Sequence, residues 1–335
     1  MLVRLSFRQM DSGVPFPGVM QPLADPRPTE GGQLLPPYSN FALYAYEPDK
    51  YDYFVLGDLH GDVESFKALA DEALRRTEKI PVLILLGDLI DRGPDSAACI
   101  RFLLSLALGG DKERERLRVL FVRGDHDEGL VCSDSDILSC VRPSEFADWF
   151  VPFGRIYTTE GALARAFARF AASSPAAILL SNGDLMAHGG VPHTDLQAKL
   201  VAGELTLWAP ECAKDFVWAR LWDHRDYPRK LPNRHTRTPA VGYEDFNDFF
   251  TVVNDILARE SWAKDLKPVS RYFHGHEHVA GGYARAQCSK LPAYTLTSFD
   301  AAGFFGDERS HPGMLRLAAE PEYIRLNPKV ETDVR

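Results

Sequence analysis

The sequence predicts an α/β fold, and three observations support this prediction. Short apolar runs rich in β-branched and aromatic residues recur along the chain, which is typical of buried strands. Segments with apolar residues at helical spacing follow the first and the second of these runs. Each run leads into a tight turn that combines Gly with Asp, Asn or His. Polar residues are therefore expected at the carboxyl ends of strands, where α/β folds bind ligands.

The apolar runs and their turns follow one another in a regular order. They are YDYFVLGDLHGD (51–62), PVLILLGDLIDRG (81–93), LRVLFVRGDHDEG (117–129), AAILLSNGDLMAHGG (176–190) and VSRYFHGHEH (269–278). Each is read as one strand followed by a turn.

Three segments between or after these runs predict helices. Residues 63–79 follow the first run and place Phe66, Leu69 and Ala73 on one helical face. Residues 95–108 follow the second run, and residues 246–260 precede the last one. The order of strand, helix and strand indicates a sheet covered by helices.

The domain organisation is simple. Residues 11–40 contain seven Pro and four Gly, which predicts an irregular N-terminal arm over residues 1–40. The remainder has neither an internal repeat nor a clear linker, so residues 41–335 are predicted to form a single domain. A chain of 335 residues is long enough to bury a substantial core.

The composition is that of a soluble globular protein, with 45% hydrophobic and 25% charged residues. A net charge of −9 gives no general attraction for nucleic acid or anionic membranes, so neither is expected as a partner. The same charge repels phosphate esters unless local positive charge or metal ions reverse the field. The oligomeric state is left open.

The predicted location is the cytoplasm. The start of the chain has no apolar segment of signal-peptide length, and no run of 18 apolar residues occurs. The five Cys are widely spaced and contain no CxxC motif, which indicates free thiols in a reducing compartment. An effector exported without a cleaved signal has the same features.

The polar turns together predict a metal site. One Gly-Asp turn or one His alone is usually structural, but here five strand ends each offer Asp or His. These side chains are ligands for hard and borderline divalent metals. Asp58 and His60 are two residues apart on a tight turn and can reach one ion. The pair His276 and His278 has the same spacing.

These turns also resemble a known family. GDLHGD (57–62), GDLIDRG (87–93), RGDHD (123–127), HGG (188–190) and GHEH (275–278) are similar, in this order, to the motifs of the calcineurin-like metallophosphoesterases. Within that superfamily, GDLIDRGPDS and RLWDHRD (220–226) resemble the phosphoprotein phosphatase branch with its short bacterial and phage members. The resemblance implies a four-layer α/β/β/α sandwich with two mixed β-sheets.

The resemblance implies two divalent ions. Asp88 is expected to bridge them, and His274 is expected to support the site without binding metal. Manganese is the expected metal, with iron, zinc and cobalt as alternatives that suit carboxylate and imidazole ligands. The implied ligands are Asp58, His60, Asp88 and His278 for one ion and Asp88, Asp125, His188 and His276 for the other.

The resemblance also implies catalytic roles beside the metals. His126 is the expected general acid, which protonates the leaving group, and Asp91 orients its ring. Arg92 is expected to grip phosphate oxygens through its planar guanidinium. A second arginine of this kind is expected between HGG and GHEH, and Arg234 and Arg237 are the candidates.

One position departs from the family pattern. The family has Asn before the general acid, whereas this chain has Asp125. A carboxylate still binds a cation, but it adds negative charge and cannot donate an N–H to a phosphoryl oxygen. We expect a working site with an altered metal preference or a lower intrinsic rate.

The implied function is metal-dependent hydrolysis of phosphomonoesters by hydroxide activated between two metal ions. The expected substrates are phosphoserine, phosphothreonine or phosphotyrosine in proteins. Hydrolysis of a dinucleoside polyphosphate or another small phosphoester is the first alternative, because such enzymes share every catalytic motif. A non-catalytic metal-binding interaction module is the second, and only Asp125 favours it.

Overall fold

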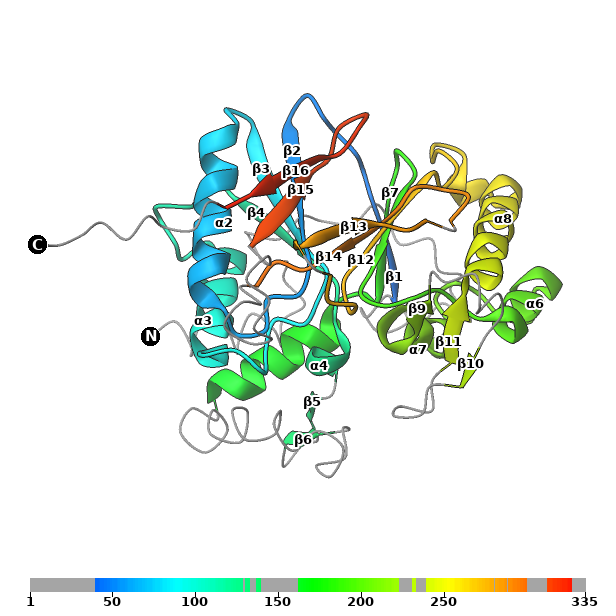
Figure 1. The fold of residues 1–335 in the computed structure, drawn as a ribbon, viewed down its shortest axis with the longest axis horizontal. Helices are drawn as coiled ribbons and strands as arrows, with labels where there is room; N and C mark the ends of the chain where they lie inside the picture. Colours follow the sequence, from blue (N-terminus) through cyan, green and yellow to red (C-terminus); the bar gives the residue numbers. More distant parts are fainter. Residues whose placement is uncertain are drawn as a thin grey trace, which may run out of the picture.

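The computed structural model describes residues 40–128, 130–132, 137–139, 162–222, 231–232, 239–279, 281–287, 289–299 and 312–326. Apart from Asn40, the predicted N-terminal arm lies outside these residues. Two large mixed sheets pack face to face, and helices cover the outer face of each (Figure 1). The predicted four-layer α/β/β/α architecture is confirmed. The assignment of residues 41–335 to one domain stays a prediction.

The first sheet has five strands in the order β16-β15-β2-β3-β4. Strands β2, β3 and β4 run parallel to one another, and β4 lies at the edge of the sheet. Strand β15 runs antiparallel to both of its neighbours, β2 and β16. The bounds are β2 Tyr51–Leu56, β3 Ile80–Leu85, β4 Arg118–Phe121, β15 Gly313–Arg316 and β16 Glu322–Arg325. The first three predicted strands are therefore neighbours, and their carboxyl ends lie at one edge of the sheet.

The second sheet has six strands in the order β1-β7-β8-β12-β14-β13. Within it, β8 and β12 are parallel, so the turns that follow them lie side by side. The bounds are β1 Phe41–Tyr44, β7 Ala177–Leu180, β8 Asp184–Ala187, β12 Arg271–His274, β13 Tyr283–Arg285 and β14 Ala293–Leu296.

The prediction of a single strand in residues 176–190 was wrong. This segment forms the hairpin of β7 and β8, which pair antiparallel around a turn at residues 181–183. Gly183 adopts a φ of 91°, a left-handed conformation that glycine reaches without steric cost. His188 consequently follows β8, next to β12, and not β7.

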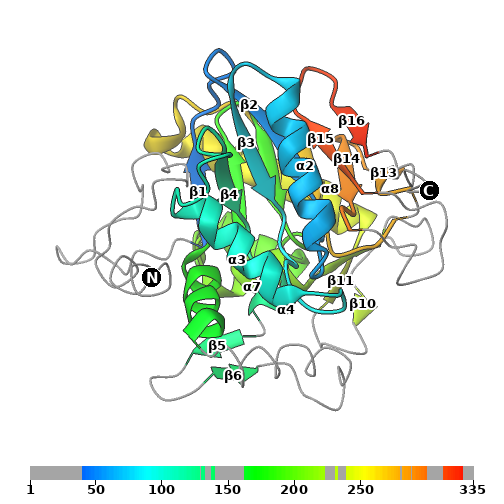
Figure 2. The same cartoon turned by 90° about the vertical axis from the view of Figure 1, so that its left-hand side faces the viewer.

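The helices form the two outer layers (Figures 1 and 2). On the five-stranded sheet lie α2, α3 and a helix over residues 162–173; on the six-stranded sheet lie α6, α7 and α8. The bounds are α2 Val63–Arg76, α3 Ser96–Ala107, α6 Thr194–Ala202, α7 Pro210–Trp218 and α8 Tyr243–Arg259. No helix in the described part of the chain is long and apolar enough to cross a bilayer.

The remaining elements are short. A helical turn, α4 (Asp125–Glu128), follows β4, and a 3₁₀ turn η1 (Ser261–Ala263) follows α8. Two small sheets lie outside the sandwich and pair β10-β11-β9 and β5-β6. Their bounds are β5 Leu130–Cys132, β6 Ile137–Ser139, β9 Arg220–Trp222, β10 Leu231–Pro232 and β11 Pro239–Gly242.

Helix α2 shows how the sequence positions a turn of the site. Asp62, the last residue of GDLHGD, caps the helix by accepting the backbone N–H of Ser65 at 3.0 Å. Phe66, Leu69 and Ala73 are buried against the sheet, as predicted. The helix thus begins directly after the turn and holds it against the end of β2. It ends at Arg76, three residues before the predicted end.

Alternation along the strands produces the two sides of the core. In β2, Phe54 and Leu56 pack under the helices, whereas Tyr53 and Val55 pack against the six-stranded sheet. This packing fixes the carboxyl ends of five strands, namely β2, β3, β4, β8 and β12. The side chains on the turns that follow these strands therefore have little conformational freedom.

Candidate metal centre

The turns that follow three of the strands, β2, β3 and β12, carry unusual backbone conformations. In the part of the chain that the structure describes, every non-glycine residue with a left-handed φ lies on these turns. Such conformations are costly for residues with a Cβ and accumulate at functional sites. The residues are His60 (φ 42°), Asp88 (50°), Asp91 (71°), Arg92 (63°) and His276 (68°).

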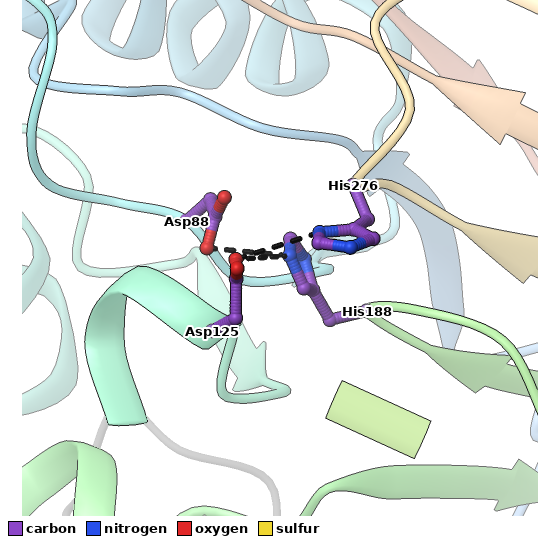
Figure 3. A group of neighbouring side chains, drawn as sticks. All are labelled: Asp88, Asp125, His188 and His276. Atoms are coloured by element: carbon purple, nitrogen blue, oxygen red, sulfur yellow. Dashed lines mark hydrogen bonds and ion pairs between the residues drawn. The ribbon is translucent and has the colours of Figure 1, made fainter. Parts of the chain in front are cut away.

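One cluster of potential ligand atoms joins both sheets (Figure 3). It consists of Asp88 after β3, Asp125 at the start of α4, His188 after β8 and His276 after β12. Their ligand atoms all lie within 4.8 Å of one another. His188 Nε2 is 3.2 Å from Asp125 Oδ1, and His276 Nδ1 is 3.4 Å from the same oxygen.

A second cluster consists of Asp58, His60 and His278. Asp58 Oδ2 lies 3.2 Å from His278 Nε2 and 3.7 Å from His60 Nε2, and the two ring nitrogens are 3.3 Å apart. Asp58 and His60 therefore lie in the same cluster, whereas His276 belongs to the first cluster and His278 to the second. His274 belongs to neither cluster.

Asp88 lies between the two clusters. Its Oδ1 is 3.3 Å from His188 Nε2 in the first cluster, and its Oδ2 is 3.6 Å from His60 Nε2 in the second. The two oxygens of the Asp88 carboxylate thus face different clusters. This is the arrangement that a carboxylate shared by two ions requires.

The charges of the clusters are unbalanced without cations. Asp58, Asp88 and Asp125 are at most 3% exposed, and isolated buried carboxylates are costly. Burial, together with the charge of Asp125 and Asp58, raises the pKa of Asp88 well above its usual value. Burial lowers the pKa of His188, but the nearby carboxylates of Asp88, Asp125 and Asp58 together outweigh it and raise that pKa well above its usual value.

The residues fit a pair of divalent ions. Among the described residues, the buried oxygen Asp58 Oδ2 forms no hydrogen bond of standard geometry. Ions bound to the carboxylates and imidazoles would supply both the missing partner of this oxygen and the missing positive charge. The donor set, with carboxylate oxygens and imidazole nitrogens and no thiolate, does not identify the metal.

Backbone carbonyls orient two of the rings. His188 Nδ1 donates to Leu86 O at 2.7 Å, and His60 Nδ1 donates to Ile90 O at 3.1 Å. A neutral ring that donates from Nδ1 presents the lone pair of Nε2, which here faces the carboxylates of the clusters.

His126 and Asp91 form a buried pair beside the clusters. His126 Nδ1 lies 2.9 Å from Asp91 Oδ2, and His126 Nε2 lies 3.8 Å from Asp88 Oδ2. Burial lowers the pKa of His126 well below its usual value and raises the pKa of Asp91 well above it. The carboxyl holds the ring so that Nε2 faces the centre.

Arg92 lies at the second cluster. Its Nη1 is 3.2 Å from His60 Nε2 and 3.0 Å from His278 Nε2. The side chain is half-buried, so its guanidinium lies between the rings and solvent. Arg234 and Arg237, the candidates for a second phosphate-binding arginine, lie outside the described residues.

Two further buried residues support the turns and rings of the centre. Asp127 accepts the backbone N–H groups of Leu89 at 3.1 Å and Gly124 at 2.9 Å, and thereby joins the turns after β3 and β4. Its position in RGDHD was the available signal. Phe299 is fully buried, with its ring centroid 5.2 Å from that of His60. It is a core residue that packs on a potential ligand.

Replacement of Gly275 by alanine is expected to weaken manganese binding about 10- to 100-fold, the range for changes that displace a ligand's support. An added Cβ would lie 2.2 Å from Asp58 Oδ1, an oxygen that accepts the N–H of His276 at 2.9 Å. Titration with Mn²⁺ by calorimetry measures the affinity. Gly203→Ala, where a Cβ meets nothing within 4 Å, is the control and should leave the affinity unchanged.

Comparison with known proteins agrees with this geometry. The family model described as calcineurin-like phosphoesterase matches residues 52–280. Two curated proteins share segments with the chain: a symmetrical bis(5'-nucleosyl)-tetraphosphatase of Buchnera aphidicola subsp. Schizaphis graminum (33% identity, 30% of this chain and 32% of the relative) and a zinc-dependent endopolyphosphatase of Saccharomyces cerevisiae (32% identity, 24% and 25%). The chain thus spans a third or less of the length of these relatives.

A solved structure has the same fold. A protein serine/threonine phosphatase from Saccharomyces cerevisiae superposes with a TM-score of 0.55 at 18% identity, covering 88% of this chain and 86% of that one. At this identity the likeness concerns the fold alone.

Proposed function

Since the chain belongs to the calcineurin-like phosphoesterase family, we propose that it hydrolyses phosphomonoesters on phosphoserine, phosphothreonine or phosphotyrosine side chains of proteins. The observation that carries this proposal is the position of Asp88, whose two oxygens face two separate groups of potential ligands. The His126–Asp91 pair lies directly beside it.

Each cluster would hold one ion. Asp58, His60 and His278 would bind one, Asp125, His188 and His276 the other, and Asp88 both. When bound, two adjacent divalent ions lower the pKa of water, polarise the phosphoryl group and offset its charge. We infer that manganese is the working metal, with iron, zinc or cobalt as alternatives.

The protein's own side chains would bind the ester and move one proton. Arg92 is placed to donate hydrogen bonds to phosphoryl oxygens from the side of the second cluster. His126 Nε2 would give its proton to the leaving oxygen, while Asp91 holds Nδ1 and stabilises the charged ring. The negative charge of a bound ester raises the pKa of His126 from its low value and favours this protonated form.

A substrate panel tests the proposal. The purified protein with Mn²⁺ is incubated with phosphoserine, phosphothreonine and phosphotyrosine peptides, with p-nitrophenyl phosphate and with a symmetrical dinucleoside tetraphosphate. Phosphate release from at least one peptide, with a kcat/KM above that for the dinucleoside tetraphosphate, is expected. No turnover of any substrate would mean that the site is a non-catalytic binding module.

The second candidate is hydrolysis of dinucleoside polyphosphates. The name of the Buchnera aphidicola relative, symmetrical bis(5'-nucleosyl)-tetraphosphatase, favours it, although only 30% of this chain aligns. A panel in which the dinucleoside tetraphosphate alone is cleaved would replace the first proposal by this one.

Asp125→Asn is expected to keep the enzyme active. The variant loses one negative charge near the phosphate and gains an amide N–H, so kcat/KM should stay within about tenfold, the size of one hydrogen bond gained or lost. Metal content is measured alongside by elemental analysis. If the variant binds no metal, the assignment of Asp125 as a replacement for the family's Asn is wrong.

A further inference from the structure

A cavity of about 460 Å³ lies on the outer face of the six-stranded sheet. His274 and Thr295 line it from β12 and β14, while their neighbours Phe273 and Leu296 point to the opposite face, into the core between the sheets. The start of β9 and the edge strand β13 form the other walls. The volume is within the range of pockets that bind small molecules.

The wall of the cavity combines apolar surface with two arginines. Leu221, Val279, Ala284 and Ala286 provide apolar lining, and Arg220 and Arg285 reach the cavity from β9 and β13. Neither guanidinium forms a hydrogen bond or an ion pair within the part of the chain that the structure describes. Among the residues that line the cavity, two arginines stand against one carboxylate, so its wall carries a net positive charge in a chain of net charge −9.

The acidic residue of the cavity, Glu277, is held by contacts to other residues of the wall. Glu277 Oε1 accepts the backbone N–H of Leu221 at 3.1 Å, and Oε2 lies 3.3 Å from His274 Nδ1. His274 Nε2 in turn lies 2.9 Å from Thr295 Oγ1. These contacts hold the carboxylate against the wall. It also interacts with the charge of Arg220, so it offsets one of the two arginines, and a net positive charge remains on the cavity.

We propose that this cavity is a second ligand site, separate from the metal centre, that binds a small organic anion. Arg220 and Arg285 would hold the negatively charged group, and the apolar lining would hold the attached hydrophobic body. The segment 274–279 separates the two sites: His276 and His278 face the metal clusters, whereas His274, Glu277 and Val279 line the cavity.

A fluorescent aromatic sulfonate, 8-anilinonaphthalene-1-sulfonate, is a suitable probe because it joins an anionic group to an apolar body and is a weak metal ligand. Its fluorescence is titrated against the full chain, with and without Mn²⁺. One saturable site is expected. Arg220→Gln and Arg285→Gln should each weaken binding by about tenfold or more, the effect of losing one charge-assisted hydrogen bond.

Arg325→Gln is the matched control, because Arg325 is an exposed arginine on β16 in the other sheet. It should leave probe affinity unchanged, and equal melting temperatures confirm that all three variants fold. Absence of saturable binding would overturn the proposal. So would unchanged affinity in both cavity variants, or binding that requires Mn²⁺, which would place the probe at the metal centre.

Discussion

Replacement of His126 by alanine is expected to lower kcat about 10²- to 10⁴-fold on a phosphoserine peptide, the range for loss of a general acid. The ring is buried, Asp91 holds its Nδ1 at 2.9 Å, and its Nε2 faces Asp88 at 3.8 Å. Without it, the alkoxide must leave unprotonated or take its proton from water. Steady-state kinetics at saturating Mn²⁺ measure the loss.

A comparison of two leaving groups distinguishes the role of His126 as general acid from a structural role. The p-nitrophenolate ion is a far weaker base than an alkoxide and leaves without a proton. His126→Ala should therefore lose much less activity on p-nitrophenyl phosphate than on the peptide. Asp91→Asn should show the same pattern with a smaller loss, since the ring remains. Equal losses on both substrates would contradict the assignment of His126 as general acid.

Asp88→Asn is expected to abolish the metal pair and with it at least three orders of magnitude of kcat, since hydrolysis then lacks both its activated water and its charge compensation. Asparagine fills the same volume and tolerates the left-handed backbone at this position, where φ is 50°. It removes the negative charge shared by both clusters. Elemental analysis should find fewer than two ions per chain.

Asp215→Asn is the control for loss of a buried carboxylate. Asp215 lies on α7, pairs with His193 and belongs to neither ligand cluster. Its replacement should reduce thermal stability but leave the metal content intact. Two retained ions in Asp88→Asn would contradict the bridging role, whatever the activity of the variant.

The strands and helices that the sequence predicted are those with strong local patterns. The apolar runs at β2, β3, β4 and β12 and the amphipathic segments of α2, α3 and α8 appear with small shifts of their ends. The error at residues 176–190 has a local cause as well. This segment contains two short apolar runs on either side of a turn, and the sequence interpretation took them as one strand followed by a polar turn. In the structure the two runs are separate strands, β7 and β8, which pair as a hairpin.

The candidate ligands could be named from sequence because their signal is local. An Asp or His placed directly after a buried strand, often two residues from a second one, is visible without knowledge of the fold. The supporting contacts were not visible. Asp127 holds a turn 38 residues away, and Asp58 accepts the N–H of His276 across 218 residues. Contacts between residues so far apart along the chain cannot be recognised in a short window of sequence.

By itself, then, the sequence determined the types of side chain that carry the chemistry, their order along the chain and the strand ends that present them. Only the tertiary structure decided which atoms meet: that Asp88 turns one oxygen to each cluster, that Phe299 is buried against His60, and that segment 274–279 has a cavity on its far side. Distances between residues far apart in the chain depend on how two sheets pack and twist against each other. That packing is a property of the whole core and not of any local pattern.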